Sequence, residues 1–157
     1  MRKAAAVLTV FLAACTHATP AARAPRGSAP ATTRNTVRAP SGAPRARMSS
    51  GTDSVEGVVV AWCEHARCQT DPTPRPKRYL PGDANGLLLF ATSAAPAAAR
   101  VEVRTPSGRV VTSGRVEAGT TMAFSARLPA GRYLVVLIAG WPDREARWGF
   151  GLVGPSG

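Results

Sequence analysis

From residue 53 onward, hydrophobic and polar residues alternate along several short segments, which is the pattern of β-strands with one buried face. Two other segments, residues 58–62 and 133–139, are hydrophobic on both faces and are expected to lie inside a sheet. Glycine, proline and other turn residues separate the segments at short intervals. The pattern predicts strands at residues 55–64, 87–91, 101–104, 109–112, 122–128, 133–139 and 146–152.

The order of these segments predicts the fold class. Residues 105–108, Thr-Pro-Ser-Gly, have the composition of a hairpin turn between two of the strands. Along the last strand, the apolar residues at positions 146, 148, 150 and 152 share one face, which is expected to point into a core. No segment has the period of a convincing amphipathic helix. We therefore expect an all-β fold, an antiparallel β-sandwich of about seven strands, over residues 53–157.

Residues 16–52 have a different composition. They consist mainly of Ala, Pro, Arg, Ser, Thr and Gly, include five prolines, and contain no aromatic or acidic residue. Such a segment buries too little apolar surface to offset the conformational entropy that is lost on folding. The sequence therefore predicts a disordered tether that ends at Thr52, directly before the sandwich domain.

The first residues have the composition of an export signal. Met1-Arg2-Lys3 is basic, and residues 4–14 are apolar except for Thr9, a run about half as long as a membrane-spanning helix. At the end of this run, Leu12-Ala13-Ala14-Cys15 resembles the lipobox of bacterial lipoproteins. The resemblance implies a signal peptide over residues 1–14, a diacylglycerol thioether on Cys15, cleavage after Ala14 and acylation of the new amino group.

The lipoprotein interpretation predicts where the protein resides. Two or more acyl chains hold a small protein stably on a bilayer. Residues 15–52 would then form a lipid-anchored tether, and the domain would lie on the extracytoplasmic face of the cell membrane. An ordinary secretory signal with an incidental cysteine, or an uncleaved N-terminal anchor, is the alternative.

The expected location decides which anionic partners a basic chain can meet. The formal net charge is +11; residues up to Thr52 include eight basic and no acidic side chains, and the rest of the chain includes 12 basic and nine acidic ones. Such an excess usually indicates nucleic-acid binding, but an exported protein meets anionic lipids and wall polymers instead. We expect no nucleic-acid partner. The expected partners are membrane lipid, through the acylated Cys15, and a cell-wall polymer or an envelope protein, whereas a merely solvated linker is the alternative for the tether arginines.

Cys63 and Cys68 are separated by only four residues. In an oxidising compartment, two thiols this close are expected to form a disulfide, which would contribute about 2 kcal/mol to stability. His65 lies between them, so a metal site made of Cys63, His65 and Cys68 is an alternative, although no fourth ligand stands nearby. A redox-active dithiol is a further alternative.

Few residues carry catalytic chemistry. His65 is the single histidine of residues 53–157, and no Gly-x-Ser-x-Gly motif presents a serine nucleophile. The glutamates fall mostly on outward positions beside arginines, where solvated ion pairs are expected. The sequence therefore predicts a protein that is not an enzyme and that uses no cofactor and no metal.

The candidate ligand contacts are aromatic and basic. Trp62 and Trp148 are expected to fill the core, whereas Trp141 stands at a strand end before a proline and is expected to be partly exposed. A proline-rich loop over residues 71–81 adds three basic side chains. The candidate contacts are therefore Trp141, Arg75, Lys77 and Arg78.

Residues 128–133, Leu-Pro-Ala-Gly-Arg-Tyr, resemble the turn-into-strand signature of pre-peptidase C-terminal and related carbohydrate-associated domains. The resemblance implies a β-sandwich of that kind over residues 101–153. Those domains often bind calcium or sugar through acidic loops, but the loops here offer only Asp83, Asn85 and Asp143, so we expect the architecture without the ligand.

Together these features predict a membrane-anchored lipoprotein with a non-catalytic β-sandwich that serves as a binding or structural module. The alternative is a metal-handling or enzymatic envelope factor centred on Cys63, His65 and Cys68.

Overall fold

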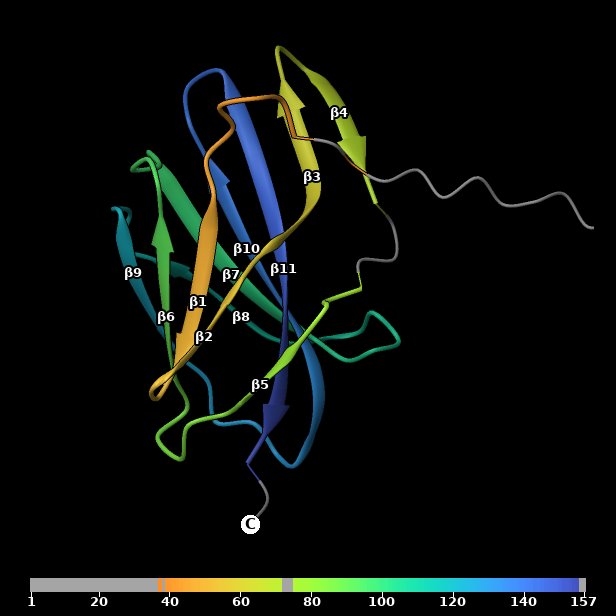
Figure 1. Cartoon of the computed structure of the whole chain (residues 1–157), viewed down its shortest axis with the longest axis vertical. Helices are drawn as coiled ribbons and strands as arrows, with labels where there is room; N and C mark the ends of the chain where they lie inside the picture. The colour runs from red at the N-terminus through yellow and green to blue at the C-terminus, as the bar shows by residue number, and fades with distance from the viewer. Residues whose placement is uncertain (1–36, 38, 72–74, 156–157) are drawn as a thin grey trace, which may run out of the picture. The chain divides into compact units, whose positions relative to one another are not determined.

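The computed structural model describes Val37, residues 39–71 and residues 75–155 (Figure 1). The expected signal peptide over residues 1–14, the expected acylation site Cys15 and most of the expected tether lie outside the described residues. None of the described residues belongs to a helix that could span a membrane.

These residues form eleven strands in two sheets, and the predicted antiparallel β-sandwich is confirmed. Each predicted strand has a counterpart, and the additional strands are short or arise where one predicted strand is divided. The strands are β1 (Ala46–Ser50), β2 (Asp53–Glu56), β3 (Val58–Glu64), β4 (Arg67–Thr70), β5 (Tyr79–Pro81), β6 (Leu87–Thr92), β7 (Ala98–Arg104), β8 (Val110–Val116), β9 (Thr121–Ser125), β10 (Gly131–Gly140) and β11 (Arg144–Gly154).

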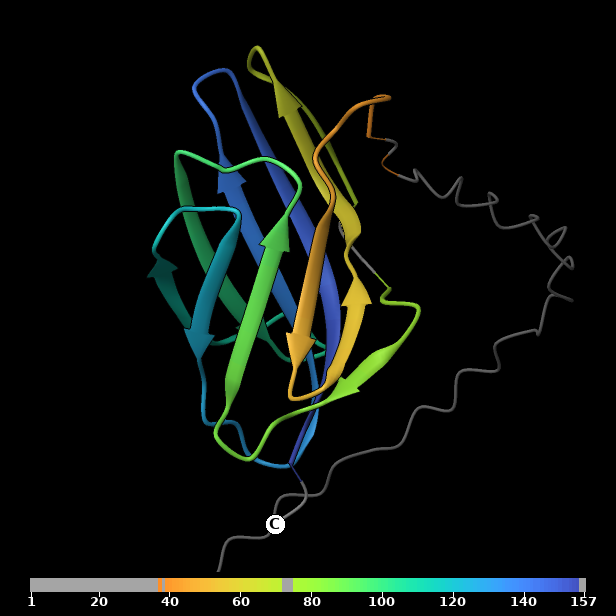
Figure 2. The same ribbon diagram turned by 60° about the vertical axis from the view of Figure 1, so that its left-hand side comes forward.

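The two sheets differ in size. The four-stranded sheet has the order β2-β1-β6-β9, and the seven-stranded sheet has the order β4-β3-β11-β10-β7-β8, with β5 paired to β11. Only the β5–β11 pair is parallel among these strands. Figure 2 shows the four-stranded sheet in front of the seven-stranded sheet. Each sheet therefore has an inner face toward the core and an outer face on the opposite side.

Gly57 divides the segment that was expected to form one strand over residues 55–64. β2 belongs to the four-stranded sheet and β3 to the seven-stranded sheet, so the chain passes from one sheet to the other at this residue. A Cβ atom on residue 57 would lie 2.7 Å from Cζ of Phe150 and 2.8 Å from Cβ of Trp148. Glycine is needed here because the backbone runs directly against core side chains.

The boundary expected at Thr52 between tether and domain is wrong, because β1 is an inner strand of the four-stranded sheet. β1 pairs with both β2 and β6, Met48 is fully buried, and Ala46 is also buried. Val37 packs against the same core. The hydrophobic pattern does not predict β1 because Met48 is its only large apolar residue, and its stability comes from pairing with two neighbouring strands.

The core lies between the inner faces of the two sheets. Phe90 of β6 and Phe150 of β11 meet edge-on across it, with ring centroids 5.7 Å apart. Trp62 and Trp148 are buried there, as predicted. The predicted inward face of the last strand is confirmed, since its apolar residues at positions 146, 148, 150 and 152 are all buried. The intervening residues of each strand therefore form the outer faces, and the strand register decides which of their side chains meet.

Candidate functional site

The β3–β4 hairpin carries the predicted disulfide. Cys63 and Cys68 are opposite each other in the register, their Cα atoms are 4.1 Å apart, and their sulfur atoms are bonded. His65 and Ala66 form the turn between the strands and both have positive φ angles, of 46° and 64°, as a tight two-residue hairpin turn requires. The disulfide prediction is confirmed.

The disulfide argues against the alternative metal site made of Cys63, His65 and Cys68. A metal binds cysteine as a thiolate, and neither sulfur of a disulfide is one. His65 is exposed at the hairpin turn, and the described residues contain no group of three or more His, Cys, Asp or Glu side chains arranged to hold a metal ion. Beside the hairpin lies a hollow of about 470 Å³, lined by Trp62, Glu64, His65, Arg67, Cys68 and Gln69.

The structure separates the candidate contacts that the sequence suggested. Trp141 lies in the turn between β10 and β11, whereas Arg75, Lys77 and Arg78 are exposed residues that precede β5. β5 pairs with β11 at Gly151–Val153, near the other end of that strand. At about 3.3 Å per residue, the two groups are roughly 20 Å apart along β11. They do not form one site.

Trp141 is half-buried and takes part in the fold. Its indole N–H donates a hydrogen bond to the carbonyl oxygen of Ala95 at 2.8 Å, and its ring packs edge-on against Trp148 with centroids 6.3 Å apart. The guanidinium of Arg144 lies 5.6 Å from the centroid of the Trp141 ring. These contacts occupy much of the side chain, so its role as a free stacking surface is limited.

A different set of charged residues gathers on the outer face of the seven-stranded sheet. We use "outer face" below for this surface, which is formed by the solvent-side residues of its strands. The charged strand residues of the outer face are five arginines and two glutamates: Arg100, Arg104, Arg115, Arg132, Arg147, Glu102 and Glu145. The corresponding face of the four-stranded sheet has one arginine, Arg47, opposite one glutamate, Glu56. The positive charge of the strands is therefore concentrated on one side of the sandwich.

The register aligns three of these arginines in one row. Arg115 of β8 is opposite Arg100 of β7, and Arg100 is opposite Ile138 of β10. Ile138 is in turn opposite Arg147 of β11. Neighbouring strands are about 4.8 Å apart, so the row extends over about 14 Å across the sheet. We call Arg115, Arg100, Ile138 and Arg147 the arginine row.

Two glutamates hold arginines of the outer face in place. The side chain of Glu102 is only 8% exposed. Its carboxylate forms an ion pair with Nη2 of Arg100 at 3.0 Å and accepts a hydrogen bond from Nε of Arg104 at 3.0 Å. Glu145 accepts from Nε of Arg147 at 2.7 Å and is 38% exposed. The solvated ion pair expected from the sequence describes Glu145, whereas the pairs of Glu102 are centred on a buried carboxylate.

Between the arginines the outer face is apolar. Val60, Val136 and Ile138 form a small buried cluster, with Leu134 packed against it. This cluster explains why residues 133–139 are hydrophobic on both faces: alternate residues of β10 enter the core and the outer face. The side chains of the surrounding arginines thus border an apolar floor.

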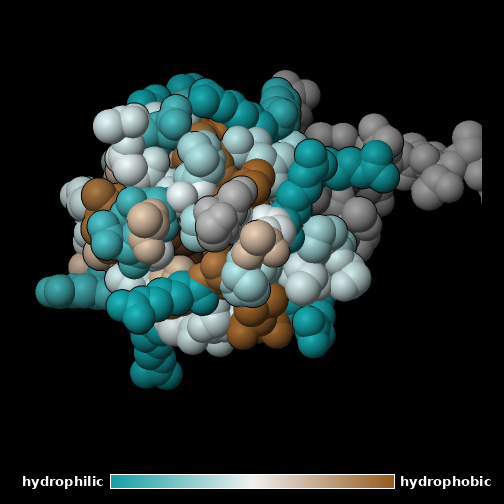
Figure 3. Space-filling model, turned by 90° about the horizontal axis from the view of Figure 1, so that it is seen from below, coloured by the Kyte–Doolittle hydropathy of each residue, from teal (hydrophilic) through white to brown (hydrophobic). Residues whose placement is uncertain are grey.

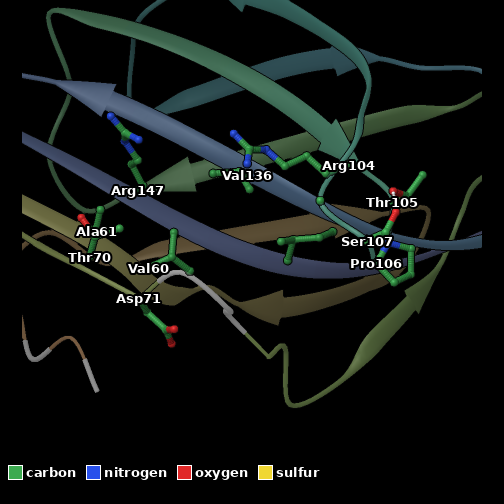
Figure 4. Close-up of a pocket in the computed structure, with 12 residues that line it drawn as sticks. Val60, Ala61, Thr70, Asp71, Arg104, Thr105, Pro106, Ser107, Val136 and Arg147 are labelled. Carbon is green, nitrogen blue, oxygen red and sulfur yellow. Dashed lines mark hydrogen bonds between the residues drawn. The ribbon is translucent and has the colours of Figure 1, made fainter. Parts of the chain in front are cut away.

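Two hollows lie on this surface. One, of about 340 Å³, is lined by Val60, Thr70, Asp71, Arg104, Thr105, Ser107, Val136 and Arg147, among others. Figure 4 shows Arg147 and Arg104 on either side of Val136, with the turn residues 105–107 at one end and Thr70 and Asp71 at the other. The second hollow, of about 570 Å³, is lined by Arg100, Arg115, Ile138, Glu145 and small residues that include Ala98 and Gly140. The outer face therefore combines fixed cations with space for a ligand.

Apolar side chains also reach the surface outside the outer face. Seen from below, most of the surface is hydrophilic, with hydrophobic patches scattered between polar residues (Figure 3). The large exposed apolar side chains in the described ranges are Leu87, Leu89, Val110 and Val111. Scattered apolar residues are normal for a protein surface and do not by themselves indicate a binding site.

The arginine row is not predicted by the sequence pattern. The signal lay in the alternation of Arg100, Glu102 and Arg104 on one strand and of Glu145 and Arg147 on another. That alternation assigns each side chain to a face but gives no register, and the register is what places Arg115, Arg100 and Arg147 in line. Comparison of the chain with protein-family models, with curated proteins and with solved structures found no match. The function must therefore be inferred from the chemistry of the chain itself.

Proposed function

We propose that the protein is an exported lipoprotein, anchored by an acylated Cys15 on the extracytoplasmic side of the cell membrane, and that its β-sandwich is a non-catalytic binding module. The structural observation that supports export is the bond between Cys63 and Cys68. Disulfides form and persist in oxidising compartments and are rare in the cytosol. The lipobox-like residues 12–15 lead to the same compartment.

The outer face supports binding over catalysis. Its polar chemistry is dominated by guanidinium groups, which donate hydrogen bonds but have no acceptor and so are not suited to serve as a general base. Guanidinium groups instead bind carboxylate and phosphate groups through paired hydrogen bonds. A cell-wall polymer or an envelope protein with anionic groups is the kind of ligand that this surface suits.

Mass spectrometry of the mature N-terminus tests the anchor. The full chain, expressed in a bacterium and recovered from membranes, is expected to begin at Cys15 and to carry the mass of a diacylglyceryl group and an N-acyl chain on that residue. Cys15→Ser is expected to abolish the lipid mass and to move the protein out of the membrane fraction, because the thioether cannot form.

A double variant, Cys63→Ser/Cys68→Ser, provides the matched control. It removes two cysteines without touching the proposed anchor, so it is expected to remain in the membrane fraction. Recovery of the unprocessed wild-type chain in the cytosol, with Cys15 unmodified and with Cys63 and Cys68 reduced, would show that the proposal is wrong.

A further inference from the structure

Arg100 and Arg115 are an unusual pair for two facing strands. They are directly opposite each other in the register of β7 and β8, so two positive charges stand on one face about 5 Å apart at the backbone. Like charges in this position repel and destabilise the sheet. Arg100 reaches Glu102, but within the described part of the chain no acidic side chain forms an ion pair with Arg115. An anion between the two guanidiniums would relieve the repulsion.

The space for such an anion is present. Arg100 and Arg115 both line the hollow of about 570 Å³ on the outer face. The hollow is open because Ala98 and Gly140, which are opposite each other in the register, contribute almost no side-chain volume. Its acidic residue, Glu145, is paired with Arg147, so its charge is largely compensated. The two arginines and the space for an anion therefore lie together beside Ile138.

Glu102 prepares the arginines for binding. Its buried carboxylate bonds to Arg100 and Arg104 on either side along β7 and restricts both long side chains. Arg100 nevertheless remains 54% exposed, so part of its guanidinium faces solvent. A cation that is already fixed loses less side-chain entropy when it binds an anion.

The geometry suits an extended ligand better than a single ion. The arginine row crosses four strands over about 14 Å, with Ile138 between Arg100 and Arg147. One phosphate group cannot contact both ends of such a row, whereas a linear chain with phosphate groups at intervals can contact several of its arginines. Phosphate is a preferred partner of the arginine fork because two parallel hydrogen bonds can form.

We propose that the arginine row binds an extended polyanion with repeated phosphate groups, as found in a polymer of the cell envelope. The inference rests on the proposed function for the location of the polymer, and it names the ligand class of the outer face. Arg115 and Arg100 form the primary phosphate site, Arg147 contacts the next anionic group along the chain, and Glu102 positions Arg100.

The test measures binding of long-chain inorganic polyphosphate to the full chain in detergent micelles. The double variant Arg100→Gln/Arg115→Gln is expected to lose at least about tenfold in affinity, because two charge-assisted contacts are removed. Arg115→Lys is expected to retain part of the affinity, since a lysine keeps the charge but not the fork. Because Arg115 forms no described ion pair, Arg115→Gln alone serves if the double variant does not fold.

Matched controls remove the same charge elsewhere. Arg47→Gln/Arg127→Gln neutralises two exposed arginines away from the outer face, and Arg23→Gln/Arg26→Gln neutralises two residues of the expected tether. Each pair is expected to change the affinity by less than about threefold, as a general charge effect. Equal losses in all three double variants would overturn the proposal, because binding would then follow net charge and not the row.

Two further binding experiments distinguish a phosphate polymer from lipid headgroups and from free phosphate. Vesicles of phosphatidylglycerol in phosphatidylcholine are expected to bind wild type and Arg100→Gln/Arg115→Gln equally, and inorganic phosphate is expected to compete poorly with the polymer. Binding to the vesicles but not to polyphosphate, or to neither, would overturn the proposal. The measurement uses purified protein, so a negative result here leaves the location of the protein, which the Cys15 experiment tests, unaffected.

Discussion

Glu102 shows how one residue can serve both the fold and the site. Its carboxylate is almost completely buried although it lies on an outer face, and its two arginine partners are 54% and 37% exposed. Burial of a charge is costly unless the charge is paired. Glu102 is therefore tolerated because Arg100 and Arg104 compensate it, and it in turn fixes both guanidiniums.

Replacement of this carboxylate by an amide tests that account. Glu102→Gln is expected to lower the free energy of unfolding by about 1–3 kcal/mol, because two guanidiniums lose their counter-charge at a buried position. The partial exposure of the arginines keeps the loss at the lower end of that range. Urea denaturation followed by tryptophan fluorescence measures it.

Glu145→Gln is the control for Glu102→Gln. The side chain of Glu145 is 38% exposed, and its one ion pair among the described residues is with Arg147, so its loss is expected to cost less than about 1 kcal/mol. Equal effects of the two substitutions would contradict the view that burial distinguishes the two glutamates.

At the scale of the strands, Gly57 allows β2 and β3 to belong to different sheets. Gly57→Ala is expected to lower the free energy of unfolding by about 1–3 kcal/mol, since the new methyl group would meet Phe150 and Trp148 below van der Waals distance. The shift of the urea midpoint at constant m-value measures the loss.

Gly140→Ala is the control substitution, at the last residue of β10. A Cβ atom at residue 140 would meet no heavy atom within 4 Å, so stability is expected to stay within about 0.5 kcal/mol of wild type. If Gly57→Ala were equally neutral, the contacts with Phe150 and Trp148 would not be the reason for glycine between β2 and β3.

The strands also show what a sequence can and cannot predict. Period-two alternation identifies β11 and its inward residues because it depends on neighbours in the chain. The Cys63–Cys68 bond is predicted from the short spacing together with the oxidising compartment expected of an exported protein. β1 escapes prediction because it has a single large apolar residue, Met48, and is held by distant strands. The arginine row is not predicted for the same reason. The alternation along β8 indicates the face on which Arg115 lies, but its alignment with Arg100 depends on how β7 and β8 pair.

At the scale of the molecule, the segregation of charge between two sheets is the feature that local sequence patterns conceal. The sequence from Asp53 onward has only a small excess of basic residues, which suggests a nearly balanced surface. Folding places five arginines and two glutamates on the outer face and a balanced pair on the face of the four-stranded sheet. A weak net charge thus becomes a directional field that can orient an anionic polymer along one side of the domain.

This segregation predicts a defined dependence of polyphosphate binding on salt. Each phosphate that an arginine neutralises releases condensed counterions, so the logarithm of the affinity falls linearly with the logarithm of the salt concentration, with a slope of about 0.7 for each contact on a single-stranded polyanion. Arg100→Gln/Arg115→Gln removes two contacts and is expected to reduce the magnitude of the slope by about 1 to 2. Arg47→Gln/Arg127→Gln removes the same charge from other surfaces and is expected to leave the slope nearly unchanged, because those residues contact no phosphate. Titrations at several salt concentrations measure both slopes. An equal reduction in the two variants would mean that the polymer is attracted by the whole molecule and not by one face of its larger sheet.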